Sequence, residues 1–217
     1  FDVPLALGKM ISTLSHRGPD ERGKWIRDDV CLGHSRLNII DLRTGGQPMA
    51  NEDGSIVTSF NGEIYNFQEL RRTLDTAGHR FKTNSDTEVL VHLWEEFGTG
   101  LVDKIEGMFA LAIWDENRKQ LFLARDRMGQ KPLYYSNTNS GLVFASELTA
   151  LMKHPEINKR IDQRSLHRYL LFDSVPSPGT MLQGVSKLEP GTWLLREKGK
   201  DRIERYWDIS FPSEDVE

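Results

Sequence analysis

Two apolar runs of strand length, separated by five polar residues, constrain the fold of this chain more than any other feature. The runs cover residues 108–114 and 120–125, and the polar segment between them is 115–119. Short apolar runs joined by a turn-forming segment are typical of a β-hairpin. The centre of the chain is therefore predicted to be antiparallel sheet.

Similar patterns extend this prediction over the rest of the chain. Further hairpin strands are predicted at 24–26 with 30–34, 132–135 with 142–145, and 191–195 with 203–207. Helical spacing of apolar residues predicts a first helix ending near Ser15, two helices stopped by Gly78 and Gly98, and one capped by Asp162. Two capping boxes are expected, Asn66 with Glu69 and Ser85 with Glu88. Hairpins beside segregated helices predict an α+β fold with antiparallel sheet.

Composition and charge narrow the functional classes. A net charge of −4 over 217 residues gives no reason to expect nucleic acid or an anionic membrane as partner. No apolar run approaches the roughly 20 residues that cross a bilayer, and no secretory pattern opens the chain, so a reducing, cytoplasmic setting is expected. The single cysteine, Cys31, lies between Val30 and Leu32 and is predicted to be a buried, inert thiol.

The segment Phe60-Asn61-Gly62-Glu63-Ile64-Tyr65-Asn66 is interpreted as a strand-to-helix corner that could carry chemistry. The Asn61 amide and the accessible backbone N–H of Gly62 are two neutral donors of the kind that stabilise an oxyanion. Glu63 could receive a substrate ammonium. The alternative is that Asn-Gly forms an ordinary turn.

Arg36 and Asp86 are two further candidates. A guanidinium at the end of a strand can bind a carboxylate through two parallel hydrogen bonds, although an isolated arginine more often forms a surface ion pair. Asp86 could simply be an acid that favours the first turn of a helix. His16 and His34, with Asp20 or Asp41, lack the spacing of a metal site, so no metal ligand is assigned. No glycine-rich phosphate loop is present.

Six motifs together resemble the class II glutamine amidotransferase domain, and most of all the N-terminal half of glutamine-hydrolysing asparagine synthetases. They are His16-Arg17-Gly18-Pro19-Asp20, Gly33-His34-Ser35-Arg36-Leu37, Phe60 to Asn66, Ser85-Asp86-Thr87-Glu88, Gly107-Met108-Phe109-Ala110, and Arg125 to Tyr135. The resemblance covers essentially the whole chain.

The resemblance implies roles for the candidate residues. Arg36 would bind the α-carboxylate of glutamine, and Glu63 and Asp86 its α-ammonium. Asn61 and Gly62 would form the oxyanion hole. Main-chain groups around Leu37 and Ile39 would line the substrate cleft.

The resemblance also implies a fold and an organisation. The fold would be the four-layer αββα sandwich of Ntn hydrolases, with two antiparallel sheets. Residues 1–209 would form the amidotransferase domain, and 210–217 a linker to a C-terminal synthetase domain that lies outside this sequence and uses ATP and Mg²⁺ to amidate aspartate. No cofactor is expected in the amidotransferase domain itself, and a homodimer is considered.

One part of the family's machinery does not match. In relatives the nucleophile is an N-terminal cysteine whose α-amino group acts as base, followed by a short apolar strand ending in a Phe-Asp like Phe1-Asp2. This chain begins at Phe1 and is expected to be inactive as it stands. Truncation is preferred, because Arg36, Asn61, Glu63 and Asp86 are all present; the alternative is a non-catalytic glutamine-binding or scaffold domain, or a synthetase with another acceptor.

Overall fold

The computed structural model describes residues 1–37 and 45–210. Its helices are α1 (Val3–Ser12), α2 (Phe67–Ala77), α3 (Glu88–Phe97), the 3₁₀-helix η1 (Gly98–Asp103), α4 (Leu148–Leu151) and α5 (Gln163–Phe172). Its strands are β1 (Glu21–Ile26), β2 (Cys31–Arg36), β3 (Met49–Ala50), β4 (Ile56–Ile64), β5 (Gly107–Asp115), β6 (Gln120–Arg125), β7 (Tyr134–Thr138), β8 (Gly141–Ala145), β9 (Ser186–Lys187), β10 (Thr192–Glu197) and β11 (Lys200–Arg205). The hairpins predicted from the sequence are all present.

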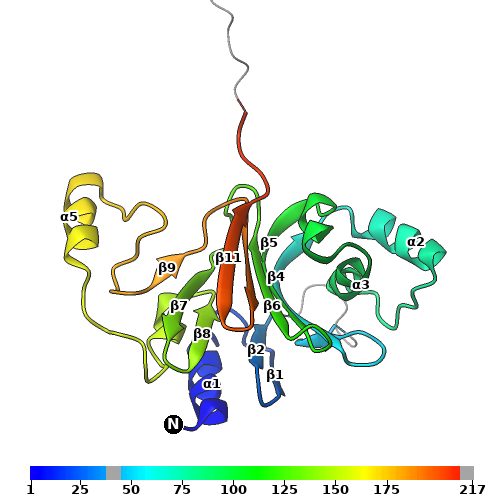
Figure 1. Cartoon of the computed structure of the whole chain (residues 1–217), viewed down its shortest axis with the longest axis horizontal. Helices are drawn as coiled ribbons and strands as arrows, with labels where there is room; N and C mark the ends of the chain where they lie inside the picture. Colours follow the sequence, from blue (N-terminus) through cyan, green and yellow to red (C-terminus); the bar gives the residue numbers. More distant parts are fainter. Residues whose placement is uncertain (38–44, 211–217) are drawn as a thin grey trace, which may run out of the picture.

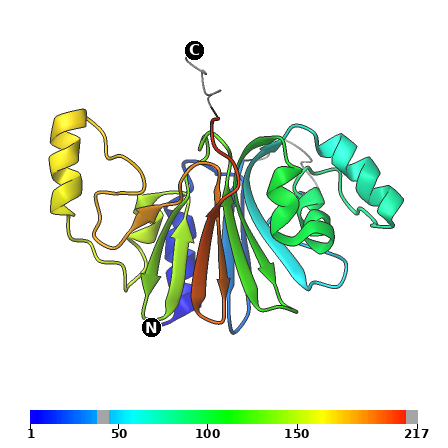
Figure 2. The same cartoon turned by 45° about the horizontal axis from the view of Figure 1, so that its top comes forward.

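The strands form three antiparallel groups within the described part of the chain. One sheet has six strands in the order β11-β10-β6-β5-β4-β3, and the others are the pair β1-β2 and the group β8-β7-β9. Helices α2 and α3 lie on one side of the six-stranded sheet, and the two smaller groups lie on its other side (Figure 1). Helix α1 is seen behind the smaller groups in the tilted view (Figure 2).

Three apolar clusters join these parts into four layers. The first packs α3 against β4, β5 and β6, for example Trp94 against Phe122, whose ring centroids are 5.0 Å apart. The second lies between the six-stranded sheet and the smaller groups. The third joins α1 and α4 to the outer side of β7 and β8. The order helix, sheet, sheet, helix agrees with the predicted αββα arrangement, except that the second sheet is divided into β1-β2 and β8-β7-β9.

Alternation along β5 explains why its sequence is apolar throughout. Phe109, Leu111 and Ile113 belong to the cluster under α3, whereas Ala110, Ala112 and Trp114 belong to the cluster between the sheets. Successive side chains of a strand point to opposite faces. A strand covered on both faces therefore lacks the polar half that a one-sided strand would show.

Two details of the prediction are wrong. Asn61, Gly62 and Glu63 do not form a strand-to-helix corner, because β4 continues to Ile64 and pairs with β5 along its length. The capping boxes are also absent. Asn66 is the N-cap of α2 without a side-chain cap bond, because its amide instead bonds the backbone of Lys104 and Glu106.

The second box fails for a similar reason. Helix α3 begins at Glu88 with Thr87 as N-cap. The Glu88 carboxylate accepts hydrogen bonds from the backbone N–H groups of Lys82 and Thr83, at 2.7 Å each. The predicted Asp162 cap is confirmed: its carboxylate accepts the N–H of Ser165 at 2.7 Å. Gly78 ends α2 in the left-handed conformation, with φ of 103°, as predicted.

Candidate functional site

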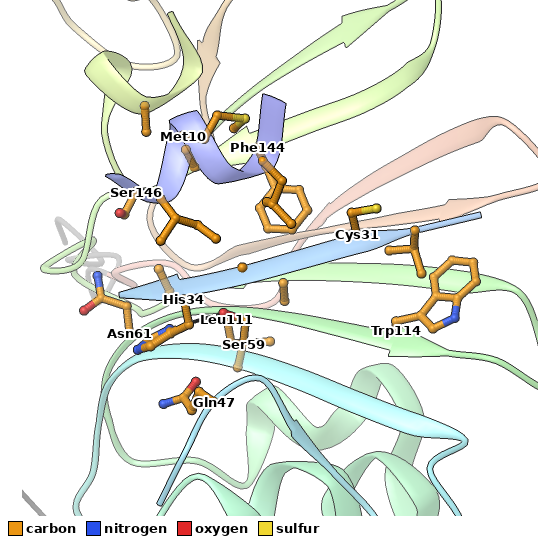
Figure 3. A pocket seen from close by; sticks show the side chains of 18 of the residues that line it. Met10, Cys31, His34, Gln47, Ser59, Asn61, Leu111, Trp114, Phe144 and Ser146 are labelled. Atoms are coloured by element: carbon orange, nitrogen blue, oxygen red, sulfur yellow. Dashed lines mark hydrogen bonds between the residues drawn. The ribbon is translucent and has the colours of Figure 1, made fainter. Parts of the chain in front are cut away.

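One large cavity lies between the layers. Its volume is about 1510 Å³, above the ~300–1,000 Å³ that is usual for small-molecule sites. Helix α1 covers it with Leu7, Met10 and Ile11, and β5 contributes Ala110 and Ala112 from the opposite side. Strand β2 and strand β8 line its flanks, and Figure 3 shows Cys31, His34, Phe144 and Met10 arranged around it.

Most of the residues predicted from the sequence line this cavity. They are Arg36, Leu37, Asn61, Gly62, Glu63 and Asp86. Arg36 ends β2, the next three lie on β4, and Asp86 precedes α3. Ile39 lies outside the described residues. The sequence motifs thus selected residues that are up to 50 positions apart. The fold brings their side chains to one end of one cavity.

Arg36 is buried, with 8% of its surface exposed. Its Nη1 lies 3.3 Å from Oε2 of Glu21 on the neighbouring strand β1. The alternative prediction was an exposed surface ion pair. Only Glu21 is exposed, with 47% of its side chain accessible, whereas the guanidinium is buried. A buried guanidinium is less hydrated and can hold a planar carboxylate with two parallel bonds.

The N–H group of Gly62 lies on the edge of β4 that does not pair with β5. The N–H of Phe60 donates to Oε1 of Gln47 at 2.6 Å, and the N–H of Ile64 donates to Oδ2 of Asp86 at 3.1 Å. In an antiparallel pair alternate residues turn their N–H groups to the same side. The Gly62 N–H therefore lies on this edge, between two groups that have side-chain acceptors, and in the described ranges no acceptor is found for it.

The close approach of β5 explains why residue 62 is glycine. An added Cβ would lie 2.1 Å from the carbonyl oxygen of Met108 on β5, which is well inside van der Waals contact. Glycine is therefore required by the close approach of β5 as well as by access to the cavity.

The neighbouring Asn61 side chain has no hydrogen-bond partner among residues 1–37 and 45–210, and it borders the cavity beside His34 (Figure 3). An amide side chain and a backbone N–H on adjacent residues are two neutral donors at the cavity wall. Such a pair can stabilise a negative oxygen without introducing a charge.

Asp86 is an acid in a buried position, with 5% exposed. Burial raises its pKa above the ordinary value and the charge of Glu63 adds to this, while the N–H bonds from Ile64 and Thr87 act in the opposite direction. Two neighbouring carboxyl groups at the cavity wall attract a cation. They add negative charge to a cavity wall that also carries the positive charge of Arg36.

The two histidines of the motifs have structural contacts. Burial, aided by the Arg36 charge, lowers the pKa of His34 to about 4, and its Nδ1 lies 3.3 Å from the Ser59 hydroxyl. His16 contacts the carbonyl of Thr13 and Oε1 of Glu147, at 3.0 and 3.1 Å. His34 is therefore neutral at pH 7, and His16 joins its loop to the segment before α4.

Cys31 lies at the other end of the same cavity, near Trp114 (Figure 3). Partial burial raises the pKa of its thiol, against the weaker effect of the Arg27 carbonyl. A raised pKa reduces the thiolate fraction that a nucleophile needs. His34, beside Asn61, is three residues further along β2, or about 10 Å at the rise of a strand. Cys31 is therefore remote from the oxyanion donors.

Sequence reasoning did not identify Gln47 or Thr87. Gln47 accepts the Phe60 N–H and donates to the Thr87 hydroxyl at 3.4 Å, so it joins the edge of β4 to the start of α3. Both residues line the cavity. The Gly45-Gly46-Gln47-Pro48 loop showed only turn chemistry, because the contact spans 40 residues.

The chain was compared with known proteins. The profile of the family described as "Glutamine amidotransferase domain" matches residues 3–207. Asparagine synthetase [glutamine-hydrolyzing] 3 of Bacillus subtilis is 39% identical over 94% of this chain and 34% of its own length. Amidase chry2 of Gibberella zeae is 37% identical over 93% of this chain and 30% of its own length. The chain thus spans about a third of the length of these relatives.

A solved structure shows the same fold. The structure titled as the allosteric regulatory enzyme of purine biosynthesis superposes with a TM-score of 0.70 at 22% identity, over 94% of this chain and 46% of that chain.

Proposed function

Because the chain belongs to the glutamine amidotransferase domain family, in its class II branch with the Ntn-hydrolase fold, we propose that it forms the glutamine-hydrolysing site of a longer asparagine synthetase. The observation that carries the proposal is the placement of Arg36, Asn61, Gly62, Glu63 and Asp86 around one end of a single cavity. In this site glutamine and water give glutamate and ammonia.

The charges of the site fit the charged end of glutamine. Arg36 would hold the α-carboxylate, and Glu63 with Asp86 would hold the α-ammonium. Main-chain groups around Leu37 and Ile39 complete the cleft in this proposal. The side-chain carbonyl of the substrate would then point to the Asn61 amide and the Gly62 N–H, which stabilise the oxyanion of the tetrahedral intermediate.

We propose that the nucleophile is a cysteine at the start of a short apolar strand that enters the cavity. Within the described residues β2 pairs only with β1, and β8 pairs only with β7 and not with β2. Both line the cavity, which also has α1 above and β5 below. A strand between β2 and β8 would bond both free edges and join the two parts of the divided sheet.

The positions of the lining residues support one direction for this strand. Asn61 lies with His34 at one end of the cavity, and Cys31 lies with Trp114 at the other (Figure 3). Phe1 also borders it, so a strand joined to Phe1 would enter it directly. A cysteine at the start of the strand could attack at the Asn61 end, with its own α-amino group as base.

The remainder of the proposal concerns the longer protein. Helix α5 stands apart from the sheets (Figures 1 and 2) and exposes Leu170, Leu171 and Phe172 by 75%, 62% and 64%. A contiguous apolar surface of this kind is typical of a contact with another domain. We assign it to a synthetase domain that follows residues 210–217 and uses ATP and Mg²⁺ on aspartate. Slower hydrogen exchange of α5 in the longer protein than in this chain would support that contact.

The domain boundary at 209, the acceptor aspartate and a cytoplasmic location are parts of the proposal. No described helix has the length and apolar character needed to cross a bilayer. A free catalytic thiol is maintained in a reducing compartment, which favours the cytoplasm. The proposed hydrolysis needs no cofactor in this domain, since thiol, amine and amide groups carry it.

The function is tested by ammonia release from the cysteine-bearing form, which is this chain preceded by a strand whose first residue is cysteine. Asn61→Ala is expected to lower kcat by about 10²–10³ with little change in KM. Asn158→Ala, at an exposed asparagine that does not line the cavity, is the matched control. Equal kcat for the Asn61→Ala variant and the control would contradict the assignment, and no ammonia from the unaltered form would favour the non-catalytic glutamine-binding domain.

A further inference from the structure

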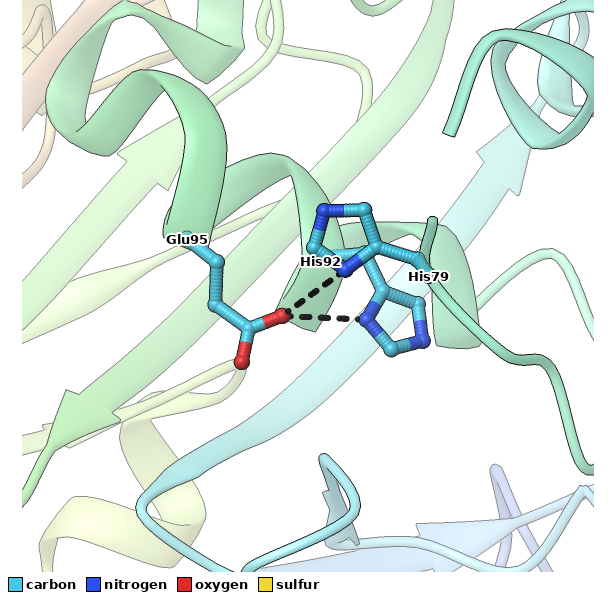
Figure 4. A group of neighbouring side chains, drawn as sticks. All are labelled: His79, His92 and Glu95. Carbon is cyan, nitrogen blue, oxygen red and sulfur yellow. Dashed lines mark hydrogen bonds and ion pairs between the residues drawn. The ribbon is translucent and has the colours of Figure 1, made fainter. Parts of the chain in front are cut away.

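A second polar cluster lies away from the cavity, where α2, α3 and the turn before β4 meet. His79 follows the Gly78 cap of α2, and His92 and Glu95 lie on α3. Atoms His79 Nδ1 or Nε2, a His92 ring nitrogen and a Glu95 oxygen lie within 4.8 Å of one another. Figure 4 shows both imidazole rings turned toward the same carboxylate oxygen.

Both ring nitrogens of His79 contact carboxylate oxygens. Its Nε2 lies 2.9 Å from Oε1 of Glu96, and its Nδ1 lies 3.3 Å from Oε2 of Glu95. A neutral imidazole carries one proton, so it can donate to only one of these carboxylates. If the proton is on Nε2, a lone pair of Nδ1 faces a carboxylate oxygen. That arrangement is favourable only when a second proton or a metal cation lies between the two atoms.

His92 presents a second nitrogen to the same oxygen. Its Nδ1 lies 3.0 Å from Oε2 of Glu95 and 3.9 Å from Oε2 of Glu52. The ring is 1% exposed, and its Nε2 is buried with no hydrogen-bond partner in the described part of the chain. The ring also packs against His79 and Phe81, with ring centroids 4.8 and 4.7 Å apart, so Nδ1 is its polar contact within the cluster.

The surrounding contacts hold the carboxylates in place. Oε1 of Glu95 accepts a 2.6 Å hydrogen bond from the Asn51 amide, which leaves Oε2 for the histidines. Glu52, Glu95 and Glu96 are three acids within 4 Å of two imidazoles. Lys82 adds one positive charge near Glu52. The cluster therefore has an excess of negative charge around two nitrogen ligands.

We propose that His79 Nδ1, His92 Nδ1 and Glu95 Oε2 bind one divalent transition-metal cation of the Zn²⁺ class, with Glu52 or water as the fourth ligand. Metal-bound nitrogen and oxygen at about 2.0–2.1 Å lie roughly 3.3 Å apart in a tetrahedral site. The two nitrogen–oxygen distances of 3.0 and 3.3 Å already match this value. The three ligand atoms all lie within 4.8 Å of one another.

The contact between His79 and Glu96 fits this assignment. A histidine that binds a metal through one nitrogen usually donates its other N–H to a carboxylate, which fixes the tautomer. Glu96 provides that carboxylate for His79 Nε2. A bound cation would also join the end of α2 to α3, and it would reach the turn before β4 where Glu52 is the fourth ligand.

The proposal is tested by titrating Zn²⁺ into this chain after treatment with a chelator. The expected result is one ion per chain, and tetrahedral ligand-field absorption when Co²⁺ is used instead. His79→Ala and Glu95→Gln should each weaken Zn²⁺ binding at least 10-fold. Glu96→Gln should weaken it by about 10–100-fold through the orientation of His79.

Two controls make the result specific. His167→Ala removes an exposed histidine of α5, and His16→Ala removes a histidine paired with one carboxylate; neither should change the Zn²⁺ affinity. No saturable binding, or equal affinity for the His79→Ala variant and the two controls, would overturn the proposal. So would ¹⁵N NMR that shows both His79 nitrogens protonated in the presence of excess Zn²⁺. These readouts do not depend on glutamine hydrolysis.

Discussion

The backbone N–H of Ile64 donates a 3.1 Å hydrogen bond to Oδ2 of Asp86, 22 residues further along the chain. This bond ties the segment before α3 to the edge of β4 on which the Gly62 N–H lies. Asp86 thus holds the strand that carries the proposed oxyanion donors, and in the proposed site it also binds the substrate ammonium. In that proposal the function of the site and the stability of the fold are coupled at this residue.

Replacement of Asp86 by asparagine should separate these two roles. The amide oxygen can still accept the Ile64 N–H, but the charge that would bind the substrate ammonium is lost. KM for glutamine in the cysteine-bearing form is expected to rise roughly 10-fold. Steady-state ammonia release measures this change, and an unchanged KM would remove Asp86 from the binding site.

The same variant has a pH signature. Burial raises the pKa of Asp86 in the folded state, so the folded chain holds this proton more tightly than the unfolded chain. This contribution is fully present below the unfolded pKa of about 3.9 and is lost as pH rises through the folded pKa. Urea unfolding from pH 3 to 8 should therefore show Asp86→Asn gaining stability over the parent as pH rises. A pH-independent difference would contradict this.

Arg36 should control substrate affinity through the shape of its guanidinium. Arg36→Lys keeps the charge but loses the two parallel bonds, and we expect KM to rise about 10-fold; Arg36→Gln should raise it about 100-fold. Glu21→Gln is the matched control, because it removes the ion-pair partner at 3.3 Å without touching the cavity. A similar KM for Glu21→Gln and Arg36→Gln would mean that loss of the ion pair, and not loss of substrate binding, explains the effect of replacing Arg36.

His34 should be neutral throughout the physiological range. Its pKa in the folded state is about 4, because burial and then the Arg36 charge disfavour the imidazolium. The unfolded chain binds this proton near pH 6.5, so stability is fully present above that value and falls as pH drops toward 4, by up to about 3 kcal/mol. NMR titration of the ring should show no protonation at pH 6.

Gly62 should tolerate no side chain. Gly62→Ala places a Cβ 2.1 Å from the Met108 carbonyl oxygen, and we expect a loss of about 1–3 kcal/mol in the free energy of unfolding. Gly100→Ala is the control, since the nearest atom to its added Cβ is 4.0 Å away. Urea midpoints compare the two, and equal midpoints would show that β5 moves away without cost.

The contrast between correct and wrong predictions has a physical basis. Hairpins, the glycine stop at Gly78 and the Asp162 cap depend on neighbours in sequence, and all are confirmed. The box at Asn66 failed because the Asn66 amide bonds a segment 38 to 40 residues away. Similarly, the extension of β4 past Asn61 depends on pairing with β5. Local patterns predict elements, whereas contacts between distant segments decide where they end.

The candidate site follows the same rule. Arg36, Asn61, Glu63 and Asp86 could be selected because each belongs to a short motif, and the fold brings them to one cavity. Gln47 could not, since its role is a bond to the Phe60 N–H at an edge where β3 has ended. The His79, His92 and Glu95 cluster was also missed, because no ligand spacing in the sequence marks it.

The most direct test of the glutaminase account is intact-mass analysis of the cysteine-bearing form, quenched in acid during turnover of glutamine. The account predicts a γ-glutamyl adduct on the N-terminal cysteine, accumulating in the unaltered form and strongly reduced in Arg36→Gln. Replacement of that cysteine by alanine should abolish both the adduct and ammonia release. An adduct on Cys31, or ammonia release that persists after the N-terminal cysteine is replaced, would contradict the account.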